Sequence, residues 1–202
     1  MYQPHESHWR ESKGILKYVS GTKFYGLFYT SANDSNVLAY IDADWVGSLD
    51  DRKSTSGYAF LFGGSLVSWC NKKKPIVALS TTEEEYIVAS STSTQVIWLS
   101  RLVEYLGMEV CKPIKFYCDN QSTISMTKNP VFHSRSKHID IQHHFIRELV
   151  QQEFIFFEFC KSEDQLADIF TKALPKDRLE KPRSQLGILK LDIKGEIEGT
   201  NA

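Results

Sequence analysis

Four acidic residues stand in apolar surroundings, where a protein core does not accept an unneutralised charge. Asp42 and Asp119 each end an apolar run, and Glu85 lies on the apolar stripe of a long helical segment. Asp168 is embedded in the largely apolar segment 165–170. Burying an unpaired carboxylate is costly, so four of them on alternating strands and helices predict one convergent cluster that cations neutralise. Hard divalent cations take oxygen ligands, and the pattern therefore indicates metal-dependent phosphoryl chemistry.

Strand alternation supports a role for Asp42. Side chains along the apolar run 37–42 alternate between two faces, so Leu38, Tyr40 and Asp42 share one face. The alternative is that Asp42 is a strand-end turn residue, because Asp favours turns. Asp44 lies one pleat further out, and we interpret it as a solvent-exposed group or one that supports the site from outside.

Helix phase bears on the choice among three consecutive glutamates. Glu85 fits a capping box in which it reaches back to the amide of Thr82. Stepping back along the apolar stripe by three or four residues also leads to Glu85, whereas Glu84 shares a more mixed face. The stripe consists of Leu106, Val103, Leu99, Val96, Thr92 and Ala89. We therefore expect Glu85 to face the sheet and another side chain to cap the helix.

The other two carboxylates have simple structural alternatives. Asp119 follows an apolar strand and precedes a helix start at 120–122, where it fits an N-cap. Asp168 sits within an expected helix beside Leu166 and Ile169. Taken alone, Asp168 is best interpreted as an exposed helical residue.

The elements that must position these residues alternate in type. Three strands precede a long helix, and two further strands are reached through helices. This order predicts an α/β fold with a mixed five-stranded sheet and helices on its faces. The expected strands are 37–42, 57–62, 65–70, 114–119 and 154–159, after a short one at 25–29, and the expected helices are 8–20, 82–106, a short one ending near 128, 136–152 and 163–173.

Composition sets outer limits on the class of protein. The chain has 202 residues, 42% of them hydrophobic and 24% charged, which is ordinary for one globular domain with a sizeable core. The net charge of −1 means that nucleic-acid binding would need a local basic patch. The four cysteines form no CxxC pair, which argues against a zinc ribbon and a disulfide framework. No segment resembles a membrane span or a secretory signal, so we expect an intracellular protein of the cytoplasm or nucleus.

Local motifs around the four carboxylates resemble the ribonuclease H domain of Ty1/copia-type retrotransposon Pol polyproteins. They occur in the order of that family and lie within residues 37–175. The motifs are YIDADW (40–45), RKSTSGY (52–58), LSTTEEEY (79–86), YCDNQS (117–122), KNPVFHSR (128–135) and EDQLADIFTK (163–172).

The resemblance implies a ribonuclease H-like fold, with a five-stranded mixed sheet flanked by helices. It implies that Asp42, Glu85, Asp119 and Asp168 are catalytic and hold two Mg²⁺ ions, for which Mn²⁺ may substitute. Asp42 would bridge both ions. The implied reaction is endonucleolytic cleavage of the RNA strand of an RNA–DNA hybrid. Many cellular ribonucleases H carry a histidine in the loop before the last catalytic helix, whereas this chain has Cys-Lys-Ser at 160–162.

The same resemblance divides the chain and names its partners. Residues 1–30 would be part of the segment that links reverse transcriptase to ribonuclease H, 31–175 the ribonuclease H-like domain, and 176–202 a loosely packed C-terminal tail. The expected partners are an RNA–DNA hybrid and the reverse transcriptase portion of the same polyprotein, with no membrane.

Two basic groups are candidates for substrate binding. Lys72, Lys73 and Lys74 form an expected basic tip that either contacts phosphates or is a solvated turn at a strand edge. Arg135 and Lys137 could also face phosphates. Four histidines lie near them, at His133, His138, His143 and His144, and a zinc site there is an alternative without a nearby cysteine pair.

Three functions remain open from the sequence. The first is a hybrid-specific endoribonuclease. The second is a catalytically silent structural or nucleic-acid-binding remnant of that domain, and the third is another nuclease or integrase-like enzyme of the same fold.

Overall fold

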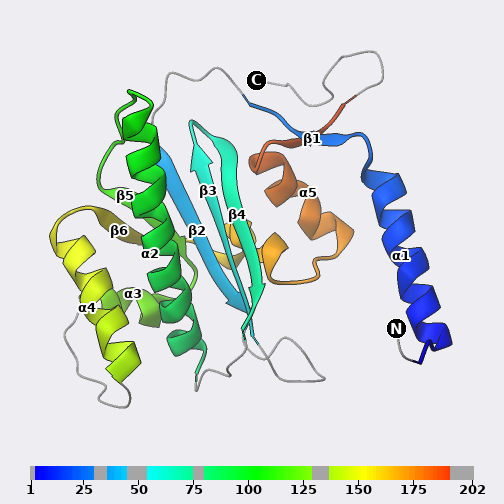
Figure 1. The fold of residues 1–202 in the computed structure, drawn as a ribbon, viewed down its shortest axis with the longest axis horizontal. Helices are drawn as coiled ribbons and strands as arrows, with labels where there is room; N and C mark the ends of the chain where they lie inside the picture. The colour runs from blue at the N-terminus through cyan, green and yellow to red at the C-terminus, as the bar shows by residue number, and fades with distance from the viewer. Residues whose placement is uncertain (1–2, 30–35, 45–53, 75–79, 129–136, 192–202) are drawn as a thin grey trace.

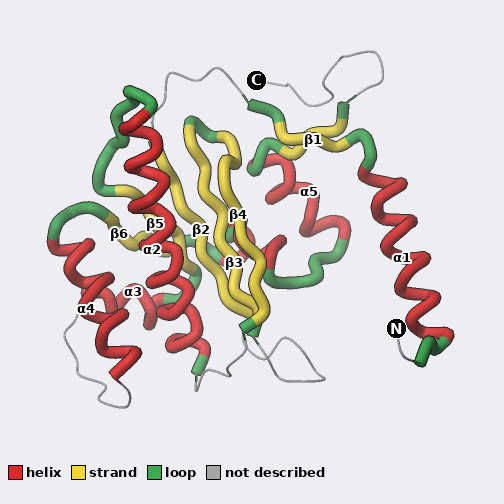
Figure 2. The backbone as a smooth tube through the Cα atoms, in the orientation of Figure 1, coloured by secondary structure: helices red, strands yellow, loops and turns green. Residues whose placement is uncertain are grey.

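A five-stranded mixed sheet forms the centre of the protein. The computed structural model describes residues 3–29, 36–44, 54–74, 80–128 and 137–191, without the side chains of 137–140. The sheet is mixed and five-stranded, as predicted, and its strand order is β4-β3-β2-β5-β6 (Figures 1 and 2). The first three strands are antiparallel, and β5 and β6 run parallel to β2. Their bounds are β2 (Val37–Asp44), β3 (Thr55–Phe62), β4 (Ser65–Lys73), β5 (Ile114–Cys118) and β6 (Ile155–Phe159).

Alternating side chains of the sheet build two separate apolar clusters. On β2, Ala39 and Ile41 belong to the larger cluster, while Leu38 and Tyr40 pack against the smaller one. The larger cluster includes residues of α2 (Thr81–Tyr105), α3 (Gln121–Lys128) and α4 (Lys137–Gln151). The smaller one includes Leu166 of the 3₁₀ turn η2 (Leu166–Phe170) and Leu186, next to α5 (Lys176–Gln185). The period-2 pattern thus supplies a core on both faces of the sheet.

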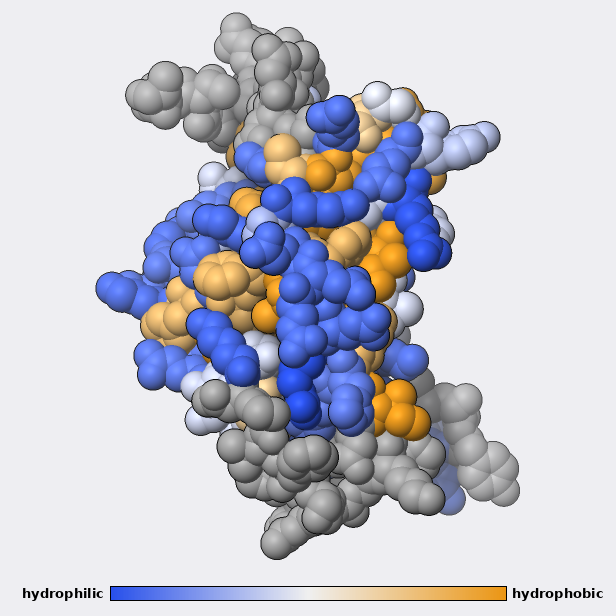
Figure 3. All heavy atoms as spheres, turned by 90° about the vertical axis from the view of Figure 1, so that its left-hand side faces the viewer, coloured by the Kyte–Doolittle hydropathy of each residue, from blue (hydrophilic) through white to orange (hydrophobic). Residues whose placement is uncertain are grey.

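The outer surface of the helical layer is mainly polar. Figure 3 views the side of the molecule on which α4 lies in Figure 1, and polar side chains there are interspersed with smaller apolar groups. None of the helices in the described ranges is long and apolar enough to span a membrane.

The segments before and after the main sheet meet in a second, two-stranded sheet. Strand β1 (Tyr25–Leu27) pairs antiparallel with β7 (Ile188–Lys190), and α1 (Glu6–Thr22) contributes no buried residue (Figure 1). We expected a loosely packed tail after residue 175, yet 176–190 form α5 and β7. The expectation failed because this mainly charged segment contains a few apolar residues that pack in the core. Among them, Leu186 is fully buried against β3 and β4. The domain boundaries themselves stay a prediction.

Two expected local structures were wrong. The strand expected to end at residue 70, before a basic tip, continues to Lys73, because Lys72 and Lys73 pair with Ser56 and Thr55 through the main chain. Backbone pairing does not depend on the side chain, and lysine suits an edge strand. The expected helix at 163–173 is instead two 3₁₀ turns, η1 (Ser162–Asp164) and η2.

Gly57 permits the closest approach between η2 and the sheet. It pairs with Asp42 on the neighbouring strand. A Cβ atom at this position would lie 2.6 Å from Thr171 Cγ2 and 3.1 Å from Phe170 Cβ. A side chain at residue 57 would therefore force Thr171 or Phe170 to shift away from the sheet.

We expect Gly57→Ala to lower the free energy of unfolding by about 1–3 kcal/mol, because the added methyl group pushes the segment after η2 away from β3. Denaturant unfolding measures this change. Gly14→Ala is the matched control: a Cβ there has no neighbour within 4 Å, so the variant should be as stable as the wild type or slightly more so. Equal stability of Gly57→Ala and the wild type would contradict the close approach.

Candidate metal centre

Three of the four predicted carboxylates converge at one edge of the sheet. Asp42, Asp119 and Asp168 each offer an oxygen, and these atoms all lie within 4.8 Å of one another. Asp42 lies near the end of β2, and Asp119 directly follows β5. Because β2 and β5 are parallel, their carboxyl ends meet at the same edge. Asp168 reaches this edge from η2.

Asp42 is the most enclosed member of the cluster. It is 2% exposed, and both of its oxygens accept hydrogen bonds. Lys172 Nζ donates to Oδ1 at 3.1 Å, and the hydroxyl of Thr171 donates to Oδ2. Burial raises the pKa of Asp42, and the ammonium of Lys172 and the hydroxyl of Thr171 act in the opposite direction.

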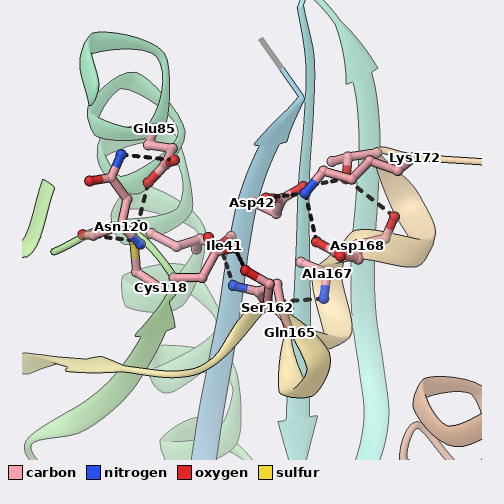
Figure 4. Close-up of polar contacts among 12 residues, drawn as sticks. Ile41, Asp42, Glu85, Cys118, Asn120, Ser162, Gln165, Ala167, Asp168 and Lys172 are labelled. Carbon is pink, nitrogen blue, oxygen red and sulfur yellow. Dashed lines mark hydrogen bonds and ion pairs between the residues drawn. The ribbon is translucent and has the colours of Figure 1, made fainter. Parts of the chain in front are cut away.

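Asp168 is held in place by the tight turns around it. Its side chain is 5% exposed and accepts a 2.9 Å hydrogen bond from Lys172 Nζ. The buried amide of Gln165 donates to the carbonyl of Ile41 at 2.9 Å and accepts from the amide of Ala167 at 3.2 Å (Figure 4). Gln165 therefore fastens η2 to β2 beside Asp42, and the simple interpretation of Asp168 as an exposed helical residue was wrong.

Asp119 is partly exposed and does not cap the following helix. Asn120 does so instead, since its Oδ1 accepts from the amides of Ser122 at 2.9 Å and Thr123 at 3.3 Å. Asp119 Oδ2 accepts a 2.9 Å hydrogen bond from Ser162 Oγ. Ser162 lies in the segment 160–162, where the sequence comparison expected this chain to lack the loop histidine of many cellular ribonucleases H. The polar group that this loop offers to Asp119 is a hydroxyl.

Glu85 lies outside the group of three and has its own set of donors. It is 8% exposed, and its carboxylate accepts from Asn120 Nδ2 at 3.1 Å, Cys118 Sγ at 3.3 Å and Thr123 Oγ1 at 3.3 Å. Figure 4 shows this group on one side of β2 and the Asp42–Lys172–Asp168 group on the other. Burial raises the pKa of Glu85 to about 7, although the hydrogen bonds from Asn120 and Cys118 lower it.

The start of α2 corrects one detail of the phase argument. Another side chain does cap the helix, as predicted: Ser80 Oγ accepts from the amide of Glu83 at 3.2 Å. Glu84, however, is more buried than Glu85, at 1% against 8% exposed, and accepts a 3.1 Å hydrogen bond from Ser56 of β3. The helix rests on the sheet with a wider face than the apolar stripe alone indicates.

The predicted substrate-binding residues are only partly described. Lys72 and Lys73 lie on the edge strand β4, and Lys74 follows it. Arg135 and the side chain of Lys137 lie outside the described part of the chain, as do His133 and the side chain of His138. His143 is buried, with its ring 4.1 Å from that of Tyr86, so it packs in the core.

Sequence reasoning did not single out Lys172, Thr171, Gln165 or Ser162. One signal was available for Lys172: it follows Asp168 by four residues, a spacing at which opposite charges pair on a helix. Gln165 follows three polar residues, Ser162 to Asp164, so its neighbours in the sequence do not indicate that it is buried. The spacing of Lys172 from Asp168 does not indicate that β2 is the further partner.

Two plant retrotransposon polyproteins are similar to nearly the whole chain. Identity is 38% over 191 residues with the Retrovirus-related Pol polyprotein from transposon RE2 of Arabidopsis thaliana, which covers 95% of this chain and 13% of that protein. It is 40% over 185 residues with the polyprotein from transposon TNT 1-94 of Nicotiana tabacum, which covers 92% of this chain and 14% of that protein. The homologues of this chain are Ty1/copia-type Pol polyproteins. The chain spans only 13% and 14% of the length of these two relatives, and no family model matches it.

A solved structure identifies the fold of this Pol segment. The N-terminal RNase H domain of a Mycobacterium tuberculosis protein, solved as a fusion with maltose-binding protein, matches it with a TM-score of 0.50. The match covers 74% of this chain and 97% of that chain at 10% sequence identity. The Pol segment therefore has the ribonuclease H-like fold, as predicted.

The donor set of the three aspartates fits a hard divalent cation. All three offer carboxylate oxygens, which suit Mg²⁺ and Mn²⁺. Asp42 and Asp168 are also almost fully buried, and buried charges are stable when they are paired with a cation, as with Lys172 here, or coordinate a metal ion.

We expect Glu85→Gln to be more stable than the wild type at pH 8 in EDTA, by on the order of 1–3 kcal/mol. The raised pKa means that folding favours the protonated carboxyl. Its stabilising contribution is complete below the ordinary glutamate pKa of 4.5 and is lost as pH rises through about 7. Glutamine mimics the protonated form at every pH, with its oxygen toward Asn120 and its amide toward Cys118 and Thr123.

Urea unfolding at pH 4.5, 6 and 8 measures this difference, which should vanish at the lowest pH. The exposed Glu109→Gln variant is the control and should follow the wild-type profile. A Glu85→Gln variant that tracks the wild type at all three pH values would show that Glu85 does not carry this penalty.

Proposed function

We propose that this Pol segment is a two-metal-ion endoribonuclease that cleaves the RNA strand of RNA–DNA hybrids, as the ribonuclease H part of its polyprotein. The observation that carries the proposal is the convergence of Asp42, Asp119 and Asp168 at the carboxyl edge of a ribonuclease H-like sheet. The solved RNase H domain with the same fold adds support.

Each acidic residue has a distinct task in this proposal. Asp42, Asp119 and Asp168 hold Mg²⁺, and Glu85 is the fourth acidic residue of the site, on the neighbouring side of β2. Bound divalent cations supply a water of lowered pKa and neutralise charge on the phosphate. Ser162 orients Asp119 through its hydroxyl, and Gln165 keeps η2 against β2, so that the oxygens stay within a few ångströms before any substrate arrives.

The substrate follows from the resemblance and from the surface around the site. Proteins distinguish RNA-containing duplexes by 2′-hydroxyls and groove shape rather than by base sequence. Lys72, Lys73 and Lys74 on and after the edge strand β4 would contact backbone phosphates, and Arg135 and Lys137 are further candidates. The reverse transcriptase portion of the polyprotein would place the hybrid on this surface.

A catalytically silent, nucleic-acid-binding module is the second candidate. Two observations favour it: Glu85 is occupied by three hydrogen-bond donors away from the aspartates, and an internal ammonium already contacts Asp42 and Asp168.

A labelled RNA–DNA hybrid incubated with the protein and Mg²⁺ separates the two candidates. We expect cleavage of the RNA strand alone and its loss in EDTA. Asp119→Asn should reduce the rate by at least about 100-fold, since even groups that only support a metal ligand contribute 10–100-fold. Asp119 is partly exposed, so the variant should fold normally, which circular dichroism checks.

Asp177→Asn, an exposed substitution on α5, is the matched control and should cut at the wild-type rate. Binding of the hybrid without cleavage at high protein concentration would favour the silent module. Equal cleavage of duplex DNA would overturn the hybrid assignment.

A further inference from the structure

The two most buried carboxylates of the metal centre share one internal cation. Lys172 Nζ lies 3.1 Å from Asp42 Oδ1 and 2.9 Å from Asp168 Oδ1. The lysine side chain is 34% exposed, whereas both aspartates are almost fully buried. The partly exposed lysine thus contacts one oxygen of each of the two buried aspartates (Figure 4).

Hydrogen bonds of the turn fix the main-chain position of Lys172. The amides of Thr171 and Lys172 donate to the carbonyl of Asp168 at 3.1 and 2.9 Å, and the hydroxyl of Thr171 donates to Asp42. The turn is thus attached to β2 independently of the lysine. The flexible four-carbon stem of Lys172 leaves the ammonium free to exchange partners while the turn stays in place.

Electrostatics keep the lysine charged at this position. Its ammonium lies within 3.1 Å of an oxygen of Asp42 and of Asp168, and nearby carboxylates favour the charged form of a lysine. An ammonium and a divalent cation a few ångströms apart repel strongly in a partly buried site. Both cations need the same two carboxylates, so their binding is mutually exclusive or strongly antagonistic.

We propose that Lys172 is an exchangeable internal cation, which neutralises Asp42 and Asp168 until a divalent metal ion displaces it. This inference rests on the proposed function, because it concerns the same carboxylates. Lys172 is then a positioning residue with two opposing effects. It stabilises the fold in the absence of metal, and it weakens metal binding by competition.

The test is a titration with Mn²⁺ alone at pH 8, in which free Mn²⁺ is followed by electron paramagnetic resonance. We expect Lys172→Met to bind Mn²⁺ about tenfold more tightly than the wild type, equivalent to about 1.4 kcal/mol. In EDTA the same variant should have a lower melting temperature, and saturating Mn²⁺ should raise that temperature more than it does for the wild type. A purely structural lysine would lower the melting temperature without tightening metal binding.

Two further variants make the outcome decisive. Lys172→Gln removes the charge but keeps an amide donor, so it should fold even if the methionine variant does not, and it should also bind Mn²⁺ more tightly. Lys115→Met removes an ammonium that pairs with Glu158 at 3.3 Å on another part of the sheet, and it should leave the Mn²⁺ affinity unchanged.

The two proposals fail in different ways. If the wild type binds Mn²⁺ and cuts the hybrid, but folded Lys172→Gln binds Mn²⁺ no more tightly than the wild type, only the proposal for Lys172 is overturned and the proposed function stands. A wild type that binds no Mn²⁺ and cuts no hybrid overturns the metal-dependent function itself.

Discussion

Burial of the Asp42 carboxylate is the constraint on which the rest of the site depends. Both of its oxygens are bonded by residues that follow η2, so the sheet and the turn stabilise each other. In the absence of metal, removing the ammonium of Lys172 would leave the buried charge of Asp42 without a cationic partner, which is destabilising. The absence of a side chain at Gly57 and the buried amide of Gln165 serve the same contact. What looks like a set of separate local features is one attachment of η2 to β2.

The acidic residues around the sheet edge are neutralised in two different ways. Asp42 and Asp168 share the ammonium of Lys172, which lies within 3.1 Å of an oxygen of each. Glu85 receives only neutral donors, and burial raises its pKa to about 7. A protein that must collect several carboxylates in a small volume thereby avoids placing all of their charges there at once. Divalent cations would change this balance, because they favour the ionised form of every ligand.

Much of this architecture was predictable because it depends on local periodicity. Alternation along β2 correctly separated its two faces, and the apolar stripe of α2 correctly brought Glu85 to the sheet side. The same reasoning failed for Glu84, since a helix that crosses a sheet buries more than its apolar stripe. It also failed for residues 176–190, because the few apolar side chains of this charged segment pack against strands that are distant in the sequence.

The sequence by itself determined the mixed sheet, the order of its elements and the identity of the acidic residues, because these follow from spacing and from family-specific motifs. Only the tertiary structure decided which carboxylates meet and what neutralises them. It grouped Asp42 with Asp119 and Asp168, gave Glu85 a separate set of donors, and placed Lys172 between two aspartates. The physical reason is that a charge in a low-dielectric interior is stabilised by whichever groups lie close to it in space. Contacts between the parallel strands and η2 join residues far apart in the chain, so no periodic sequence pattern indicates them.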